Sequence, residues 1–457
     1  MAVSFVVRRS ELERALRLDA EYYQPKHSID FTKGSWLPIG DIVQTCQYGI
    51  SRAMTEEPIG YAIFRMDDIK SGFLVDDAVK CVQIPEDVFK KCRLDREDLL
   101  FNRVNSEEFV GRTGIFRLGG EYVFASYLIR LRVKSSSPIL PDYLNVFLNS
   151  SFGIRQIRKL SRRAVNQANV NAEELRSIKV AVLPAPAQKE VKRLCEESFS
   201  GFEASKALYA EAERMVLDGL GWETLDLSQP KWWAVALSRA REVERLDADH
   251  YQPKYAELIA HLKKTRKARP LGEIATYIKR GVQPRYVEGG EVIVVNSQHL
   301  GRYTLSMDTT ARTDGRFWEE NSRARIEKGD LLLYATGAPY VGRTNWYLDE
   351  VKAVGSNHVT ILRTGRPMAF QGYLSVFLNS PAGMAQAAAY QKGSNQQELY
   401  PDDIARFVVH IAPEEVQARV AHLVTQSYEA RQEARALFEE ARRKVEGVIE
   451  GAAGAGQ

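Results

Sequence analysis

The segment from Gly153 to Val170, GIRQIRKLSRRAVNQANV, combines the side-chain types that contact DNA. It has five cations and no acid, and three amides follow among the next residues. Cations neutralise phosphates, whereas Asn and Gln pair with adenine and Arg pairs with guanine. A solvated basic helix end would carry the same cations. The candidate DNA contacts are Arg155, Arg158, Lys159, Arg162, Arg163, Asn166, Gln167 and Asn169.

A second polar segment, YQKGSNQQELY, begins at Tyr390. It keeps the amides of the first segment and loses most of its positive charge. Amides at both places favour DNA contact over a solvated helix end, because base reading needs more than phosphate-binding cations. The candidates in this segment are Lys392, Ser394, Asn395, Gln396 and Gln397.

Three further loops carry cations beside polar or aromatic residues: YGISRAM, IKRGVQPRY and a hairpin-like loop within NRVNSEEF. Each is a weak signal by itself, because charged residues mostly lie on protein surfaces whatever their role. The candidates are Arg52 in the first loop, Lys279, Arg280, Gln283, Arg285 and Tyr286 in the second, and Arg103 and Asn105 in the third.

Sequence patterns of catalytic sites are missing. The chain has no G-x-x-x-x-G-K-[ST] loop, no H-E-x-x-H, no paired C-x-x-C and no G-x-S-x-G. Its histidines are scattered singly. We therefore predict a protein that is not an enzyme, with no catalytic residues, no metal and no cofactor in this chain.

The composition permits a nucleic-acid partner without requiring one. The net charge is +4, and 44% of the residues are hydrophobic, which is enough for packed cores. No apolar run approaches the roughly 18 to 20 residues of a membrane span, and the N-terminus does not resemble a signal peptide. The four cysteines are dispersed, which favours a reduced, cytoplasmic location.

One long stretch of sequence occurs twice in the chain. RLDAEYYQPKH begins at Arg17 and RLDADHYQPKY at Arg245, 228 residues later, and eight of their first ten positions are identical. YLNVFLNS at Tyr143 returns as YLSVFLNS at Tyr373. The period is far longer than the repeats of 20 to 50 residues that build solenoids. The chain is therefore predicted to be two domains made by duplication. Loops match worst between the copies, and loops carry specificity on a rigid frame.

The periodicity predicts an α+β fold. Short alternating apolar runs such as YAIFRM and YLIRLRV predict strands, while PDYLNVFLNS has helical spacing. After Pro184 and again after Pro413, helical spacing continues for over thirty residues. Each copy thus ends in a long amphipathic helix, which needs a partner for its apolar stripe.

The simplest partner for each long helix is its own duplicate, in an antiparallel coiled coil. Alternatively, each helix packs only on its own globular unit. The predicted residues of the helix-pair interface are Val191, Leu194, Phe199, Phe202, Leu208, Val416, Val420, Leu423, Tyr428, Leu437 and Phe438.

These patterns divide the chain into seven predicted parts. They are an N-terminal segment 1–36 that repeats 229–264, a first α/β domain 37–183, a long helix 184–222, a connecting segment 223–268, a second α/β domain 269–412, a long helix 413–450 and a disordered tail 451–457.

The architecture and these phrases together resemble the specificity subunit of type I restriction–modification systems. The resemblance covers essentially the whole chain. It rests on the doubled LDAEYYQPK and LDADHYQPK, on YLNVFLNS and YLSVFLNS followed by Asn/Gln loops, and on VLPAPAQKEV leading into a long helix. The second copy of that last phrase, HIAPEEVQARV, is degenerate.

The resemblance implies two target-recognition domains in pseudo-twofold symmetry, held apart by the helix pair, each reading one half of a bipartite, asymmetric DNA site. It also implies two methyltransferase subunits docked on the helices, which carry S-adenosylmethionine and the catalysis, and restriction–translocase subunits that join some complexes. It does not carry over base-contacting residues, since those loops vary most within the family. The expected role is phage defence in the cytoplasm.

Three other functions stay open from the sequence. The chain could be the DNA reader of another methylation-linked phage-defence system, a coiled-coil scaffold that binds only proteins, or a self-sufficient nuclease or methyltransferase. A protein-only scaffold would lack the steep salt dependence of phosphate contacts. Turnover by the purified chain alone would identify an enzyme.

Overall fold

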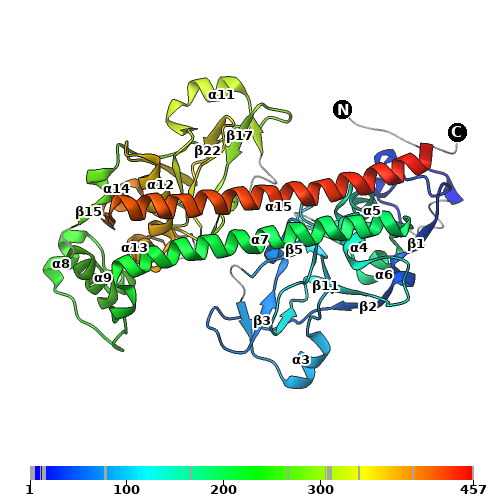
Figure 1. Ribbon diagram of the computed structural model, residues 1–457, viewed down its shortest axis with the longest axis horizontal. Helices are drawn as coiled ribbons and strands as arrows, with labels where there is room; N and C mark the ends of the chain where they lie inside the picture. The colour runs from blue at the N-terminus through cyan, green and yellow to red at the C-terminus, as the bar shows by residue number, and fades with distance from the viewer. Residues whose placement is uncertain are drawn as a thin grey trace. The chain divides into compact units, whose positions relative to one another are not determined.

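The computed structural model describes residues 6–10, 12, 17–76, 80–164, 167–264, 267–303, 305, 311–337, 340–393 and 396–454 (Figure 1). The chain divides into two compact units, which we call unit 1 (residues 1–202 and 432–457) and unit 2 (residues 203–431). Both mix strands and helices, as the sequence predicts. Among the helices of the described residues, none is long and apolar enough to cross a membrane.

Unit 1 is built on a six-stranded sheet whose central strands are almost fully buried. Its order is β2 (Val43–Tyr48), β11 (Leu128–Val133), β7 (Leu99–Asn102), β9 (Thr113–Ile115), β5 (Phe73–Leu74) and β4 (Ile69–Lys70). A smaller sheet has the order β10 (Tyr122–Phe124), β3 (Tyr61–Phe64) and β6 (Lys80–Val82). β1 (Trp36–Pro38) pairs with β14 (Lys179–Ala181).

Two consecutive helices of unit 1 lead toward the candidate DNA-contacting segment. α4 (Pro141–Asn149) starts on a proline, which suits a first helical turn. Ser150 then caps α5 (Ser151–Leu160) by accepting the Gly153 backbone N–H. Beyond this segment, α6 (Ala172–Ser177) begins with a capping box. The remaining short helices of this unit are α2 (Ile39–Ile42) and α3 (Glu86–Cys92).

Unit 2 has two four-stranded sheets. The first has the order β16 (Tyr277–Arg280), β23 (Val359–Arg363), β20 (Leu331–Tyr334) and β21 (Thr344–Trp346). The second has the order β18 (Arg312–Thr313), β17 (Val292–Val295), β22 (Ala353–Gly355) and β19 (Arg325–Ile326). β15 (Ala268–Pro270) pairs with β24 (Val408–His410). The helices are α8 (Leu237–Val243), α9 (Pro253–Lys264), α10 (Leu271–Ile274), α11 (Gly315–Glu320), α12 (Met368–Asn379), α13 (Pro381–Tyr390) and α14 (Pro401–Ala405).

The central strands of the two units pair in the same register. In unit 1, Arg130 lies between Gln47 and Leu100. In unit 2, Ile361 lies between Lys279 and Leu332. Strand β2 is followed by Gly49 and strand β16 by Gly281. At both glycines a Cβ atom would collide with backbone carbonyls. Only glycine permits such a close backbone approach, which explains why both copies carry it.

Two long helices, α7 (Ala185–Leu220) and α15 (Glu414–Gly454), each contribute residues to both units. In unit 1, Ser198 Oγ donates to the Ala434 carbonyl at 2.6 Å, and Lys444 pairs with Glu190 at 2.9 Å. Numbers rise along α7 as they fall along α15, so the two segments run antiparallel there (Figure 1). α15 extends into the predicted tail, whose residues 455–457 lie outside the described part of the chain.

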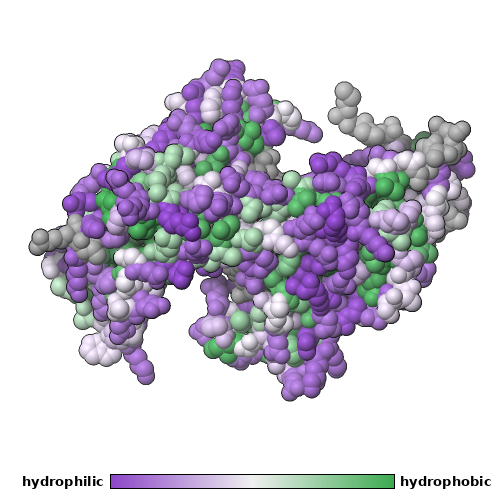
Figure 2. Space-filling view, in the orientation of Figure 1, coloured by the Kyte–Doolittle hydropathy of each residue, from purple (hydrophilic) through white to green (hydrophobic). Residues whose placement is uncertain are grey.

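The predicted interface residues of unit 1 pack on each other and on the sheet. Phe73 of β5 meets Phe199, Phe202 and Phe438 with ring centroids 5.6 to 5.7 Å apart. The buried members are Val191, Leu194, Phe202 and Phe438, and the partly buried ones are Phe199 and Leu437. The opposite face of α7 carries ion pairs such as Arg193–Glu197, and hydrophilic residues cover the visible face of the helices here (Figure 2).

The same antiparallel contact recurs in unit 2. The hydroxyl groups of Ser205 and Ser427 lie 3.0 Å apart, and Ser427 also donates to the Ser205 carbonyl at 2.7 Å. Val420 and Leu423 are buried in the core of unit 2, with Leu208 and Val416 partly buried against it. Tyr428 instead donates its hydroxyl hydrogen to Asp349 at 2.5 Å, so its side chain points toward the segment that follows β21.

Candidate nucleic-acid interface

In unit 1, three loops that the sequence singles out lie next to one another. β8 (Val104–Asn105), from the hairpin-like loop, pairs with β13 (Gln167–Asn169), which in turn pairs with β12 (Arg162–Ala164). The loop that follows β2 joins them through residues 126 and 127. The backbone N–H of Ser126 donates to the Ile50 carbonyl of that loop, and the backbone N–H of Arg103 donates to the Tyr127 carbonyl.

Arg103 lies at the centre of this cluster. Its guanidinium sits over the Tyr48 ring, 5.0 Å from the centroid. It also donates to Asn169 Oδ1 at 3.3 Å and to the Ser126 carbonyl at 3.4 Å. Arg103 and Asn169 were predicted contacts and are brought together. Tyr48 was not predicted, and the signal that could have found it is an aromatic residue at the end of an amphipathic strand, directly before the loop glycine.

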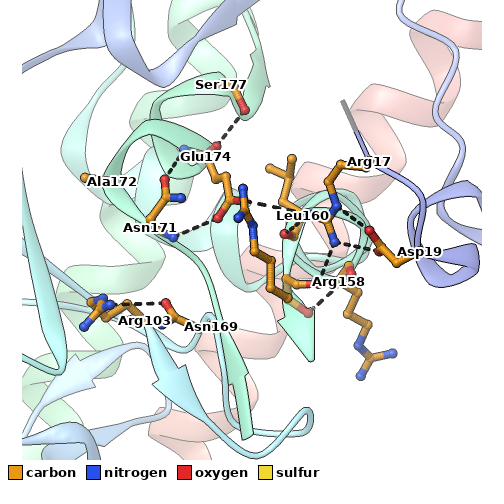
Figure 3. A network of polar contacts seen from close by, with 12 residues as sticks. Arg17, Asp19, Arg103, Arg158, Leu160, Asn169, Asn171, Ala172, Glu174 and Ser177 are labelled. Carbon is orange, nitrogen blue, oxygen red and sulfur yellow. Dashed lines mark hydrogen bonds and ion pairs between the residues drawn. The ribbon is translucent and has the colours of Figure 1, made fainter. Parts of the chain in front are cut away.

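The cations around α5 differ in how they are held. Arg155 lies over Phe152 and donates to the Ser151 carbonyl, and Lys159 lies over Tyr22. Arg162 forms an ion pair with Glu174 at 2.8 Å. Arg158 is exposed, and its side chain points away from the polar network shown in Figure 3. Arg52 and Gln167 are exposed and Asn105 is partly buried; the Arg163 side chain and Asn166 lie outside the described residues.

In unit 2, Arg280 lies at the centre of a similar cluster. Its guanidinium lies 4.9 Å from the centroid of the Tyr400 ring and 3.7 Å from Glu398. It also donates to three oxygens at 3.3 Å, those of the Ala335 carbonyl, the Thr336 hydroxyl and the Leu399 carbonyl. The strand end at Arg280 is thus joined to the polar segment that precedes Tyr400.

The other predicted contacts of unit 2 are spread over two places. Lys392 pairs with Asp403 at 2.9 Å, near the Arg280 cluster. Arg285 pairs with Asp314 at 2.5 Å, and Tyr286 hydrogen-bonds with Asn296, at the edge of the second sheet. Lys279, Gln283 and Gln396 are exposed and Gln397 is partly buried; Ser394 and Asn395 lie outside the described residues.

The repeated phrase RLDA holds the helix that precedes the polar segment (Figure 3). Arg17 donates to the Leu160 carbonyl at 2.7 Å and to the Ser161 carbonyl at 3.4 Å, at the C-terminal end of α5. Both oxygens of Asp19 accept from the same guanidinium at 2.7 Å. A cation satisfies helix-end carbonyls and complements the helix dipole. The sequence showed the repetition but not this role.

Unit 2 repeats the arrangement on α13. Arg245 donates to the carbonyls of Ala389, Tyr390 and Gln391 at 3.3, 3.1 and 2.9 Å. Asp247 accepts from Arg245 at 2.9 and 2.5 Å, as Asp19 does from Arg17. In both units the next hydrogen bond is also the same, because Tyr23 and Tyr251 donate to the carbonyls of Arg17 and Arg245. The phrase is repeated because each copy anchors a helix end.

Hydrogen bonds and nearby cations lower the pKa values of Asp19, Asp247 and Glu398. The hydrogen bonds from Arg17 hold the pKa of Asp19 below its usual value, and those from Arg245 do the same for Asp247. The pKa of Glu398 is lowered by the Tyr400 hydroxyl and further by Arg280. All three groups are therefore carboxylates at neutral pH. Within the described ranges, no three His, Cys, Asp or Glu residues gather where a metal could bind.

Comparison with known proteins finds relatives that match part of the chain. One relative is the putative type I restriction enzyme MjaX specificity subunit of Methanocaldococcus jannaschii, 28% identical over 34% of this chain and 37% of that protein. Another is the type I restriction enzyme EcoKI specificity subunit of Escherichia coli K12, 25% identical over 39% of this chain and 38% of that protein. The resemblance to type I specificity subunits is confirmed. The chain thus covers less than two fifths of the length of either specificity subunit.

Solved specificity subunits are also similar to the chain. That of M. genitalium has 12% identity and a TM-score of 0.38, covering 92% of this chain and 98% of its own. The HsdS subunit of Thermoanaerobacter tengcongensis has 14% identity and a TM-score of 0.28, covering 92% of this chain and 96% of its own. No family model matches the sequence.

Proposed function

We propose that this chain is the non-catalytic DNA sequence-recognition subunit of a type I restriction–modification complex. The observation that carries the proposal is the same pairing of four strands in both units, each with a guanidinium, a tyrosine ring and polar side chains gathered at strand ends. Loops that differ on a common frame suit the reading of two different sequences. The resemblance to type I specificity subunits supports the same function.

Each recognition domain, 37–183 and 269–412, would read one half of a bipartite, asymmetric site. The antiparallel contacts of α7 and α15 within each unit support a helix pair that acts as a spacer. Half-sites about one helical turn of DNA apart, on the order of 34 Å, would then contact one domain each. The length of the helices would fix the spacing, and the duplication would give the subunit pseudo-twofold symmetry.

The chemistry would belong to the partners. Two methyltransferase subunits would dock on the helices in the cytoplasm and supply S-adenosylmethionine and methyl transfer. Restriction–translocase subunits join some complexes of this kind. The absence of catalytic motifs from the sequence is what such a division of labour requires. Nothing in this chain would need to bind a cofactor.

The decisive experiment is a base-resolution methylome of the host with and without this gene. Loss of methylation at one asymmetric, two-part motif would establish the function and give the spacer length together. An unchanged methylome in cells that express the chain and its partners would contradict it. A pull-down of the full-length chain would then identify the partner enzyme, and with it the alternative of a reader for another methylation-linked defence system.

A further inference from the structure

The two units build the same arginine–tyrosine pair from different positions. The backbone N–H of Arg103 donates to the Tyr127 carbonyl in unit 1, and that of Ala335 donates to the His358 carbonyl in unit 2, so Arg103 and Ala335 are equivalent. The residues before Gly49 and Gly281 are equivalent as well: one is Tyr48 and the other Arg280. The strand end thus supplies the ring in unit 1 and the guanidinium in unit 2.

The missing member of each pair comes from a neighbouring loop. In unit 1 it is Arg103, whose guanidinium lies 5.0 Å from the Tyr48 centroid. In unit 2 it is Tyr400, whose centroid lies 4.9 Å from the Arg280 guanidinium. A scaffold contact inherited through duplication would keep its residues in place. Both units form an arginine–tyrosine contact, but the strand end and the neighbouring loop exchange the two residue types. This exchange indicates that the contact itself has a function.

The tyrosine rings are also unusually exposed. Across the described ranges, four tyrosines are exposed by more than two fifths of their surface: Tyr48 at 42%, Tyr127 at 45%, Tyr286 at 54% and Tyr400 at 42%. Tyr48, Tyr127 and Tyr400 belong to the two clusters, whereas Tyr286 lies at the edge of the second sheet of unit 2. An exposed aromatic ring beside a cation is suited to nucleic acid, because bases and sugars stack on the ring while the cation faces phosphates.

One polar side chain beside each pair differs in kind. Asn169 is the antiparallel strand partner of Val104 in unit 1. Glu398 is the antiparallel strand partner of Thr336, at the equivalent place in unit 2. Asn169 reaches Arg103, whereas Glu398 accepts the Tyr400 hydroxyl hydrogen at 2.6 Å. In the major groove an amide pairs with adenine, and a carboxylate accepts from the amino group of cytosine.

We propose that each arginine–tyrosine pair is the DNA-contact centre of its unit, and that Asn169 and Glu398 select the base read beside it. Asn169 would select adenine and Glu398 would select cytosine. The inference rests on the proposed function and names residues that determine its specificity. The difference between one amide and one carboxylate would be one reason why the two halves of the site are unlike.

The test is affinity selection from a random duplex DNA library with the full-length chain, purified with the proteins that accompany it. The wild type is expected to select a two-part motif. Glu398→Gln is expected to change the preferred base at one position in one half, with about a tenfold loss of discrimination. Asn169→Asp is expected to do so in the other half, and aspartate keeps an acceptor for Arg103. Glu257→Gln, on an exposed face of α9, is the matched control and should leave both halves unchanged.

A second pair of variants tests the ring. Tyr400→Leu is expected to weaken binding about tenfold, whereas Tyr400→Phe, which keeps the ring and removes only the hydroxyl group held to Glu398, is expected to weaken it less. Thermal melting of each variant identifies any loss of folding. If the wild type selects no motif, the proposed function fails and this inference with it. If the wild type selects a motif that both polar variants leave unchanged, the inference is overturned while the function stands.

Discussion

The Arg17 guanidinium lies 2.7 Å from the Leu160 carbonyl, although 143 residues separate them. The contact closes the C-terminal end of α5 just before the strand that begins at Arg162. A network then continues through Glu174, which lies 3.8 Å from Arg17 and 2.8 Å from Arg162. The N-terminal segment therefore holds the frame of a candidate DNA-contacting loop (Figure 3).

Removing this contact is expected to loosen the loop. Hydrogen bonds to charged groups contribute about 1.5 to 3 kcal/mol, and the Arg17 side chain is only 10% exposed. Arg17→Ala should speed hydrogen exchange at the end of α5 and in β12 and β13, without change in unit 2. Lys189→Ala, an exposed cation on α7, is the control. Unchanged exchange in β12 and β13 would show that the contact is not needed to hold the loop.

Arg245→Ala is the corresponding change in unit 2. It removes three hydrogen bonds to carbonyls at the end of α13. We expect faster hydrogen exchange at that helix end and in the segment up to Tyr400, with unit 1 unaffected. Exchange that rises equally in both units would contradict the assignment of one anchor to each unit.

Arg158 tests phosphate contact. It is exposed, whereas Arg162 is paired with Glu174. Arg158→Ala is expected to lower the slope of log binding constant against log salt by about one, and the double variant with Arg162→Ala by about two. Arg193→Ala, on α7 outside the candidate interface, removes the same charge and should leave the slope unchanged. Equal slopes for Arg158→Ala and the wild type would exclude Arg158 as a phosphate contact.

The long helices can be tested by proline. Ala207 in α7 and Ala436 in α15 lie in helix interiors and are exposed, so proline there breaks backbone hydrogen bonds without replacing a buried side chain. Each break costs about 3 kcal/mol or more. We expect lost recruitment of the partner subunits while the strands of both units keep their exchange protection. Ala207→Ser is the control, and normal assembly of the proline variants would contradict a docking role for the helices.

A buried carboxyl group gives unit 1 a pH-dependent stability. Burial raises the pKa of Asp68 to about 6, from 3.8, against the lowering effect of its Arg65 contacts. The folded state therefore binds this proton more tightly than the unfolded one. The stabilisation is complete below about pH 4 and is lost as the pH rises through 6, by up to about 3 kcal/mol.

Asp68→Asn should remove that loss, because the amide oxygen can still accept the Arg65 backbone hydrogen and carries no charge. Urea unfolding at pH 4 and pH 7 should show a stability difference between variant and wild type that grows with pH. Asp67→Asn, at the exposed neighbouring position, is the control. A difference that is the same at both pH values would rule out a raised pKa at Asp68.

Local sequence determined much of this protein. Alternating apolar runs gave strands, and prolines marked the starts of α4 and the long helices. Gly49 and Gly281 recur in both copies, at places where the structure has close backbone approaches. These features depend on a residue and its near neighbours, through periodicity, fixed φ angles and the absence of a Cβ atom. The repeated phrases likewise indicated one frame used twice.

Tertiary structure alone decided what the repeated phrase does and which loops form a centre. Arg17 meets Leu160, and Tyr48 meets Arg103, only because strand pairing brings distant segments together. The exchange of ring and guanidinium between the units was hidden for the same reason. A sequence comparison aligns Tyr48 with Arg280 as a mismatch, whereas the folded chain supplies each with a complementary partner from another loop.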